Sequence, residues 1–230
     1  MRILGLIPAR GGSKGIPGKN IKKLNGKPLI EYTFESAKKS KKLDKIIVSS
    51  DDDEIIKFSK DNGIFTPFKR PTEYARDDSS TFSVVKHAID YFENIDEYFD
   101  AICLLQPTSP FRSKNLIDDA CTLLFNSDAD SIISVKNVPH EYNPHWVFEK
   151  KEKGYLEIST GEKEIVKRRQ ELTEAFVRDG SVYIMRIDTI KKYKNIYGQK
   201  ILPIKNQSKF QVNLDNEKDW KNAENYLCAG

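Results

Sequence analysis

Short apolar runs alternate with segments of helical periodicity through the first 125 residues of this 230-residue chain. Apolar runs of this kind are typical of strands buried on both faces of a parallel sheet, and they lie at residues 3–7, 45–49 and 101–105. Helical spacing of apolar side chains occurs in the segments 29–37, 55–58, 79–92 and 115–125. The alternation predicts a three-layer α/β fold, with a mostly parallel sheet and helices on both faces.

The alternation breaks between residues 135 and 182. Short β-like pieces, turn residues and a basic run replace it, which predicts a β-arm of about residues 136–180 inserted into a single domain spanning 1–230. Inserted arms of this kind often form the contact between the two chains of a dimer. The remaining expected elements are short strands at 64–67, 181–185, 201–204 and 210–214, and helices from residue 189 and over 217–227.

Composition and charge exclude several classes of protein. The net charge is +4 and the lysines are scattered, which gives no footprint for a nucleic-acid partner. No apolar stretch approaches the ~20 residues that cross a bilayer. Three cysteines without Cys-x-x-Cys spacing argue against a disulfide framework and a zinc site, and we expect them to be buried thiols. We therefore expect a cytoplasmic chain with no membrane partner.

A glycine-rich basic loop follows the first expected strand directly. Residues 8–20 read Pro-Ala-Arg-Gly-Gly-Ser-Lys-Gly-Ile-Pro-Gly-Lys-Asn. The backbone N–H groups of such a loop can turn onto phosphate oxygens, while Arg10, Lys14 and Lys19 neutralise their charge. The loop is neither a Walker A sequence nor Gly-x-Gly-x-x-Gly, so it indicates polyphosphate binding without P-loop hydrolysis or dinucleotide recognition. A solvated flexible turn is the alternative interpretation.

This loop, read from Ile7 to Asn20, resembles the signature of the acylneuraminate cytidylyltransferases, the CMP-sialic acid synthetase family. Later blocks similar to that family follow in order: Val48-Ser49-Ser50-Asp51, Arg70-Pro71-x-Glu73 with Asp77, Leu104 through Arg112, and Arg169-Gln170 through Gly180-x-x-Tyr183. The resemblance implies a Rossmann-like nucleotidyltransferase fold and a homodimer formed through the arm. It also implies transfer of CMP from CTP to the anomeric hydroxyl of a nine-carbon 2-keto sugar acid, with release of pyrophosphate.

The family pattern implies a nucleotide site around the loop. It places the triphosphate against Ala9, Arg10, Gly12, Ser13, Lys14 and Lys19, and the ribose and base near Asn20, Arg70, Ser79, Ser80 and Thr81. Among these, Arg10 and Lys19, together with Asp215, are the expected catalytic residues. Displacement at the α-phosphorus needs positioning and compensation of the charge on the leaving pyrophosphate. For Arg70, a surface ion pair is the alternative.

The sugar acid is expected at the carboxyl edge of the sheet, where Gln106 follows the most apolar strand. The resemblance places a sugar contact on Gln106. Arg112 and Arg169 can meet a carboxylate bidentately, and Phe176 and Tyr183 can line an acyl substituent, with ordinary core packing as the alternative for Phe176. In the family, an asparagine commonly precedes the glycine that matches Gly180, whereas this chain has Asp179 at that position. The acceptor therefore stays open among sialic, legionaminic and pseudaminic acids and a sugar phosphate.

A Mg²⁺ ion is implied near the end of the chain. The family normally offers two aspartates separated by one residue, and this chain has Asn213-Leu214-Asp215. Asn213 brings an oxygen without charge, so we expect the ion to depend on Asp215 and on the triphosphate oxygens. Capping of the final helix is the alternative role for Asp215.

Two further groups of polar residues have simpler explanations than a metal site. Helix capping explains the acidic run at 51–54, and His140 and His145 lack a third partner, which favours a structural or substrate-contact role.

The sequence thus predicts a Mg²⁺-dependent cytidylyltransferase that uses CTP and a nonulosonic acid. Two alternatives remain. One is a nucleotidyltransferase that joins another NTP to a sugar 1-phosphate. The other is a nucleotide-binding homologue that lost catalysis with its second carboxylate.

Overall fold

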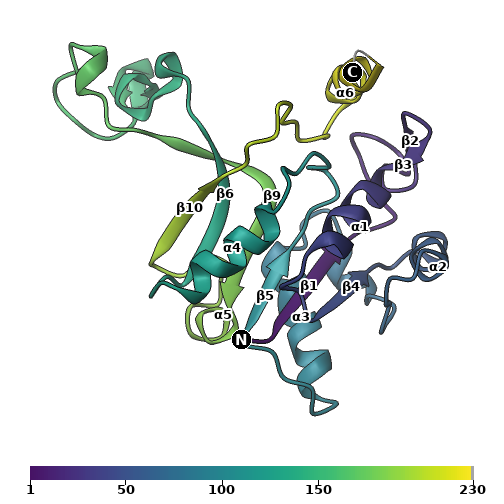
Figure 1. Cartoon of the computed structure of the whole chain (residues 1–230). Helices are drawn as coiled ribbons and strands as arrows, with labels where there is room; N and C mark the ends of the chain where they lie inside the picture. The colour runs from purple at the N-terminus through teal and green to yellow at the C-terminus, as the bar shows by residue number, and fades with distance from the viewer. Residues whose placement is uncertain (229–230) are drawn as a thin grey trace. The chain divides into compact units, whose positions relative to one another are not determined.

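The computed structural model describes residues 1–228. A six-stranded sheet in the order β10-β6-β9-β5-β1-β4 forms its centre (Figure 1). Its strands are β1 (Ile3–Pro8), β4 (Lys45–Ser49), β5 (Ala101–Leu104), β6 (Ser131–Asn137), β9 (Phe176–Arg186) and β10 (Ile201–Lys205). Strand β1 pairs in parallel with β4 and β5, whereas β9 pairs antiparallel with β5. The expected α/β fold with a mostly parallel sheet is confirmed.

Helices cover the sheet on both sides, with α1 and α4 on the near face in Figure 1 and α3 on the far face. The helices are α1 (Leu29–Lys39), α2 (Asp53–Asp61), α3 (Thr81–Glu93), α4 (Leu116–Phe125), α5 (Ile187–Tyr193) and α6 (Glu217–Cys228). Side-chain hydrogen bonds cap the first turns of two of these helices, α2 and α3. Asp52 accepts a hydrogen bond from the Ile55 N–H, and Ser80 accepts one from the Ser83 N–H. Helix capping as the explanation of the acidic run is thereby confirmed for Asp52.

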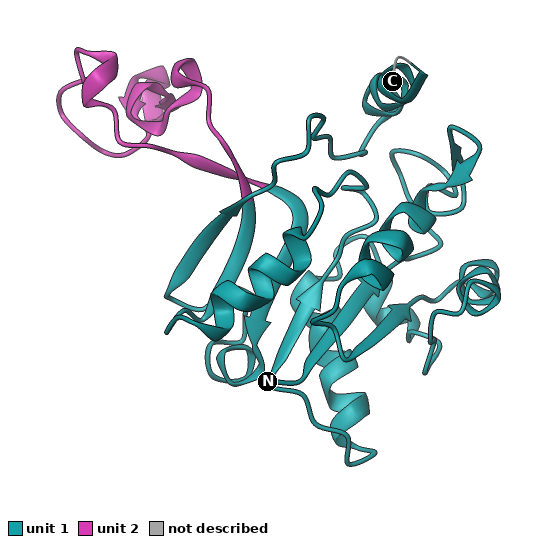
Figure 2. Ribbon diagram, viewed as in Figure 1, with its two compact units in different colours: residues 1–134, 179–230 teal, residues 135–178 magenta. Residues whose placement is uncertain are grey.

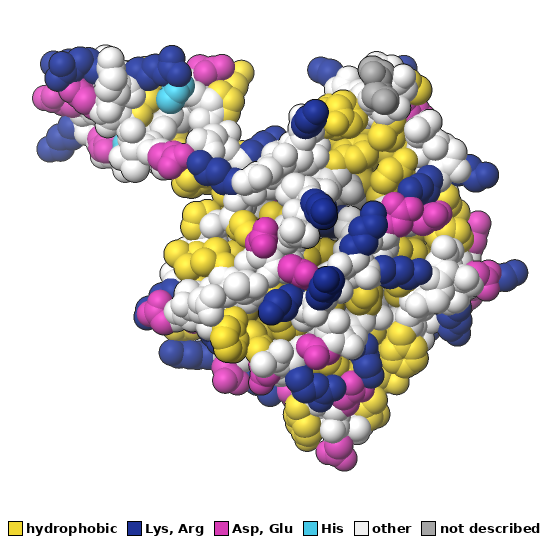
Figure 3. Space-filling model, in the orientation of Figure 1, with side chains coloured by type: hydrophobic (Ala, Val, Ile, Leu, Met, Phe, Trp, Pro, Cys, Tyr) yellow, Lys and Arg dark blue, Asp and Glu magenta, His cyan; other side chains and the backbone are white. Residues whose placement is uncertain are grey.

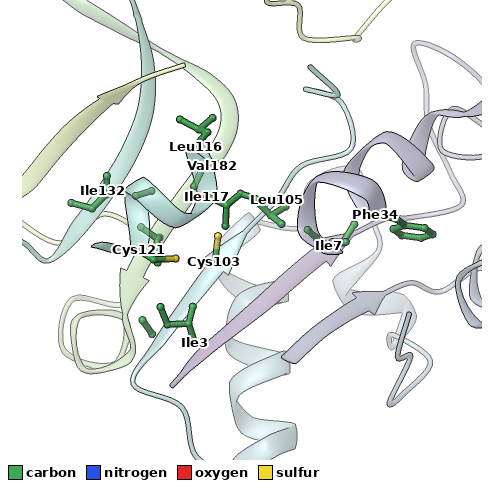
Figure 4. Close-up of a cluster of buried hydrophobic side chains, with 14 of the residues drawn as sticks. Ile3, Ile7, Phe34, Cys103, Leu105, Leu116, Ile117, Cys121, Ile132 and Val182 are labelled. Atoms are coloured by element: carbon green, nitrogen blue, oxygen red, sulfur yellow. The ribbon is translucent and has the colours of Figure 1, made fainter. Parts of the chain in front are cut away.

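The main hydrophobic core lies between the sheet and the helices α1 and α4. Ile7 of β1 and Phe34 of α1 belong to it, as do Cys103 of β5 and Cys121 of α4 (Figure 4). Burial raises the pKa of the Cys121 thiol to about 12, so this thiol stays protonated at neutral pH. Cys228 is exposed, so the expectation of three buried thiols is wrong for the last cysteine.

A second, smaller core fixes the glycine-rich loop to the end of the chain. Its buried members come from the loop, from the small hairpin β2 (Lys23–Leu24) and β3 (Lys27–Pro28), and from α1, the segment before α6, and α6: Ile16, Leu24, Leu29, Leu214, Trp220 and Ala223. The contact joins residues about 200 positions apart in sequence. It brings the loop next to the segment that carries Asn213 and Asp215.

Two expected strands do not form. Residues 64–67 make only an isolated parallel bridge, between Phe65 and Ile47. Residues 210–214 have no partner strand, although Phe210, Val212 and Leu214 pack on the second core. The alternating apolar side chains of this segment do face a core. They pack against the core that includes α6, and they do not indicate pairing in a sheet.

The chain divides into two compact units, residues 1–134 with 179–230, and residues 135–178 (Figure 2). The second unit contains the hairpin β7 (Phe148–Lys150) and β8 (Leu156–Ile158) and several short 3-10 turns. Within it, the Trp146 indole N–H donates to the Val166 carbonyl at 2.7 Å, and the His145 imidazole Nδ1 lies 2.9 Å from the Glu162 carboxylate. Over residues 1–228, no helix is long and apolar enough to cross a membrane.

Candidate functional site

The glycine-rich loop leaves β1 at the carboxyl edge of the sheet and is held there by hydrogen bonds. The Ala9 N–H donates to the Ser49 carbonyl at 2.9 Å, which continues the pairing of β1 with β4. The buried Asn20 side chain donates to the Arg10 carbonyl at 2.9 Å, so it closes the loop across its base. Ala9 and Asn20 therefore shape the loop in this structure, and their expected contacts with a nucleotide stay predictions.

Two basic side chains of the loop converge on one carboxylate. Arg10 Nη1 lies 2.7 Å from Asp77 Oδ1, and Lys14 Nζ lies 2.8 Å from Asp77 Oδ2. The side chain of Lys14 is 81% exposed, whereas that of Arg10 is 33% exposed. Gly12 and Ser13 lie between the two cations in sequence, and nothing lies within 4 Å of a Cβ atom added at Gly12. The loop therefore has open space beside the backbone of Gly12.

Lys19 connects the same loop to the end of the chain. Its Nζ donates to the Leu214 carbonyl at 2.7 Å and lies 3.4 Å from Asp215 Oδ1. Its side chain is only 11% exposed, and this burial lowers the pKa of Lys19, while the neighbouring Asp215 opposes the change. A partly desolvated cation next to a single carboxylate is well suited to accept an anionic ligand.

Asp215 belongs to a short chain of polar contacts. The Asn213 amide donates to Asp215 Oδ2 at 2.7 Å, and the Ser109 hydroxyl lies 3.4 Å from Asn213 Oδ1. The same hydroxyl donates to the Asp179 carbonyl at 2.9 Å. Asp215 does not cap α6, because Asn216 Oδ1 accepts the hydrogen bonds from the first N–H groups there. The alternative role considered for Asp215 is therefore wrong.

Two glycines permit close approaches in this region. A Cβ atom at Gly15 would lie 2.0 Å from the Asp215 carbonyl oxygen. A Cβ atom at Gly180 would lie 2.5 Å from Ser109 Oγ and 3.1 Å from Gln106 Oε1, and the φ of Gly180 is +80°. Because no larger residue fits either position, the loop, the Asp215 segment and the Gln106 side chain can lie together only with glycine there.

Gln106 follows β5 at the same edge of the sheet, as the sequence predicts. Arg112 holds the backbone here, because its guanidinium donates to the carbonyls of Gln106 and Ser181, each at 2.8 Å, and to the Thr33 hydroxyl at 3.0 Å. Burial lowers the pKa of Arg112 to about 10. With these three partners, Arg112 holds the backbone at Gln106 and Ser181, and its expected contact with a sugar carboxylate stays a prediction.

Arg70 is likewise buried among protein groups. It is 4% exposed, its Nε donates to Ser49 Oγ at 2.9 Å, and its Nη2 donates to the Ser49 carbonyl. Burial lowers the pKa of Arg70 to about 10. The surface ion pair considered as an alternative is wrong. The side chain fixes the end of β4, and a contact of Arg70 with a ribose or base stays a prediction.

The segment expected near the base is formed by local hydrogen bonds. Ser79 Oγ donates to the Glu73 carbonyl at 2.8 Å, Ser80 caps α3, and Thr81 is the first residue of that helix. These contacts define the turn that also carries Asp77. Contacts of Ser79, Ser80 and Thr81 with a nucleotide stay predictions.

Asp179 is a buried acidic residue near the end of β5, at the edge where the sugar acid is expected. Its Oδ1 accepts hydrogen bonds from the Ser181 N–H at 2.9 Å and from the Ser134 hydroxyl. Its Oδ2 has no hydrogen-bond partner among residues 1–228, although Asp179 is only 9% exposed. A buried carboxylate oxygen without a donor is costly, which makes this atom a candidate acceptor for a ligand group.

Tyr183, Arg169 and Phe176 are the remaining predicted sugar residues, and Tyr183 pairs with Leu104 at the end of β5. Tyr183 is 2% exposed and packs edge-on against Tyr197, with ring centroids 6.5 Å apart, so most of its surface is used by the protein. Arg169 and Phe176 belong to the second unit. There Arg169 begins an exposed 3-10 turn and Phe176, 36% exposed, begins β9. Their role in sugar binding stays a prediction.

The residues fit a magnesium ion that arrives with its nucleotide. Among residues 1–228, no group of three or more His, Cys, Asp and Glu side chains could hold a metal by itself. Asp215 offers a carboxylate that is 60% exposed, and Asn213 offers an amide oxygen. Magnesium commonly binds through one or two carboxylates together with substrate phosphates and water. One carboxylate beside a basic, glycine-rich loop is compatible with that mode of binding, and a magnesium ion here stays a prediction.

A separate hollow of about 620 Å³ lies between the end of α1 and the start of α4. Lys39, Lys41, Lys114 and Arg112 are among its lining residues. Figure 3 shows basic side chains gathered over the middle of this face, above α4 and α1. Only Arg112 is shared with the predicted site, so this hollow does not coincide with it.

Known proteins resemble this chain along most of its length. A family described as Cytidylyltransferase matches residues 4–226. This chain belongs to the cytidylyltransferase family. It is 32% identical to the CMP-N,N'-diacetyllegionaminic acid synthase of Legionella pneumophila, over 99% of this chain and 97% of that protein. It is 33% identical to a pseudaminic acid cytidylyltransferase of Campylobacter jejuni, over 80% of this chain and 78% of that protein.

A solved structure shares the fold of this family member. It is a CMP:2-keto-3-deoxy-manno-octonic acid synthetase complexed with CTP, which superposes with a TM-score of 0.71 at 15% identity. The alignment covers 100% of this chain and 99% of that one. At this identity the likeness supports the Rossmann-like nucleotidyltransferase fold.

Sequence reasoning missed two residues that organise the site. Asp77 and Ser109 both lie inside the motif blocks. The sequence around a short polar residue does not indicate which distant residue it will bind by an ion pair or hydrogen bond. Asp77 bridges two loop cations, and Ser109 joins the Asp179 backbone to Asn213. Each contact spans 60 or more positions in sequence, so periodicity could not reveal it.

Proposed function

We propose that this chain transfers a CMP group from CTP to the anomeric hydroxyl of a nonulosonic acid and releases pyrophosphate. The observation that carries the proposal is the meeting of three segments at one edge of the sheet. The basic loop after β1 contacts the Asp215 segment through Lys19, and Ser109 connects that segment to the strand end beside Gln106. The family relatives, whose names describe CMP transfer to legionaminic and pseudaminic acids, support the acceptor class.

The reaction needs charge compensation more than covalent help. The anomeric oxygen attacks the α-phosphorus, and the bond to the oxygen bridging the α- and β-phosphorus atoms breaks. Pyrophosphate leaves with that electron pair, and the hydroxyl gives its proton to solvent water. Negative charge accumulates on the leaving group, and Arg10, Lys14 and Lys19 are the cations of the loop that can compensate it. Lys19 is the most buried of the three, so its charge acts with the least screening.

Magnesium is part of the proposal. Asp215 and the amide oxygen of Asn213 would hold the ion together with the triphosphate. When bound, it supplies additional positive charge to the phosphates. The Lys19 ammonium, 3.4 Å from Asp215, orients that carboxylate beside the loop. Because the protein offers one formal charge here, we expect a higher magnesium requirement than two aspartates would give.

A pyrophosphate-release assay tests the proposal. Each of the four NTPs is combined with sialic, legionaminic and pseudaminic acids and with a panel of sugar 1-phosphates. We expect release only with CTP and a nonulosonic acid. Lys19→Met should abolish release, whereas Lys23→Met, at an exposed position on β2, should leave it within about twofold of wild type. Release with another NTP and a sugar 1-phosphate would overturn the assignment, and tight CTP binding without any release would indicate a silent homologue.

We also propose that the protein works as a homodimer, through the second unit. This unit exposes large apolar side chains, with Tyr155 72%, Leu156 64% and Phe148 47% exposed. A hollow of about 590 Å³ that includes Phe148, Leu156 and Ile165 lies among them. Exposed apolar groups of this size usually mark an interface. Light scattering should give twice the chain mass for wild type and one chain mass for Leu156→Lys.

A cytoplasmic location completes the proposal. Cys103, Cys121 and Cys228 are all free thiols in this structure, which agrees with a reducing compartment.

A further inference from the structure

Asp77 lies in the turn between the 3-10 helix Thr72–Tyr74 and α3, and both of its carboxylate oxygens are used by the phosphate-binding loop. One oxygen lies 2.7 Å from Arg10 Nη1, and the other lies 2.8 Å from Lys14 Nζ. Lys14, and then Arg10, hold the pKa of Asp77 below its usual value. The carboxylate is therefore an anion that spans two cations of the loop.

These two cations are among those that the proposed function assigns to the triphosphate. A carboxylate that bridges two cations presents two oxygens much as a phosphate group does. Arg10 and Lys14 therefore cannot serve Asp77 and a phosphate fully at the same time. The exposed fractions of the side chains, 44% for Asp77 and 81% for Lys14, allow such an exchange without unfolding the loop.

We propose that Asp77 is a positioning residue that stands in for the phosphates of the nucleotide. It holds Arg10 and Lys14 over the loop before CTP binds and gives both up to the phosphates. It takes both back when pyrophosphate leaves. This inference rests on the proposed function, because it requires the loop to bind a polyphosphate.

Exchange with phosphates and simple bracing of the loop predict opposite changes in ligand affinity when Asp77 is replaced. If Asp77 competes with phosphates, its removal tightens binding of any ligand that reaches both cations. If Asp77 only braces the loop, its removal loosens the loop and weakens binding. Two exposed ion pairs of ordinary strength correspond to a change of about three- to tenfold in the dissociation constant. CMP, which lacks the β- and γ-phosphates, should be insensitive.

Calorimetric titration with inorganic pyrophosphate, CTP and CMP, at excess magnesium, measures the sign directly. The variants are Asp77→Asn, Asp77→Glu and Asp78→Asn. The last removes the same charge from the neighbouring exposed residue and so controls for the general field of the protein. We expect Asp77→Asn to bind pyrophosphate and CTP about three- to tenfold more tightly and CMP within about twofold of wild type. Asp78→Asn and Asp77→Glu should stay close to wild type.

Product inhibition gives an independent readout. The inhibition constant of pyrophosphate should fall in Asp77→Asn by the same factor as the dissociation constant. Equal or weaker pyrophosphate binding by Asp77→Asn, or an equal gain in Asp78→Asn, would overturn the inference while leaving the proposed function intact. Failure of the wild-type protein to bind pyrophosphate and CTP would instead overturn the proposed function, and the inference with it.

Discussion

Replacement of Gly15 by alanine should disable the site without unfolding the protein. A Cβ atom there would lie 2.0 Å from the Asp215 carbonyl oxygen, whereas real Cβ contacts essentially never fall below 3.0 Å. The loop and the Asp215 segment must therefore separate by at least about 1 Å. A displacement of 1 Å at an active site can cost on the order of 100-fold in rate, which corresponds to about 2.7 kcal/mol of transition-state stabilisation.

Gly63→Ala is the matched control, because nothing lies within 4 Å of a Cβ atom at this glycine, which follows α2 outside the loop. We expect kcat/KM for CTP to fall about 100-fold in Gly15→Ala and less than about twofold in Gly63→Ala. Both variants should melt somewhat below wild type, because Gly15→Ala strains the core contact that holds Ile16 and Leu214, and Gly63→Ala places alanine at a φ of +65°. Activity of Gly15→Ala within about threefold of wild type would refute the claim that this contact aligns the phosphate loop with Asp215.

Three other changes test separate parts of the site. Arg112→Met should lower the free energy of unfolding by about 3 kcal/mol in urea titrations, because it removes three partly buried hydrogen bonds, one of them to the Thr33 hydroxyl; an unchanged midpoint would contradict this. Asn213→Asp should lower the half-saturating magnesium concentration severalfold, and identical metal titrations would count against a role for this position. Burial lowers the pKa of Lys19 from 10.5, so CTP binding should weaken as the pH rises through that lowered value and the ammonium loses its charge. In Lys19→Arg, the loss of CTP binding at alkaline pH should move to higher pH. If it occurs at the same pH as in wild type, a group other than Lys19 is responsible.

Much of the fold could be predicted from the sequence because its strands are buried on both faces. The apolar run at residues 45–49 reports burial directly, and the strand Lys45–Ser49 forms there. The extended segment at 210–214 shows the limit of such patterns. Its alternating Phe210, Val212 and Leu214 do pack against a core, but alternation cannot tell whether a neighbouring strand is present.

The site could be predicted only in part, since residue type indicates chemistry but not the partner. The basic loop was identified because Arg10, Lys14 and Lys19 lie close together in sequence. The positions of Arg70 and Arg112 could not be foreseen, because arginine in a motif suggests an anionic ligand. Both are instead satisfied largely by backbone carbonyls near strand ends, and these contacts depend on how distant segments meet.

The antiparallel strand β9 has a consequence for synthesis of the chain. β5 ends at Leu104, and its partner β9 begins about 70 residues later, so a ribosome adding 5–20 residues per second needs roughly 4–14 s to deliver it. During that interval one edge of an entirely apolar strand has no neighbour, which is a template for incorrect pairing. Chains that terminate between residues 105 and 175 retain this open edge, and we expect them to aggregate rather than accumulate as a stable amino-terminal half.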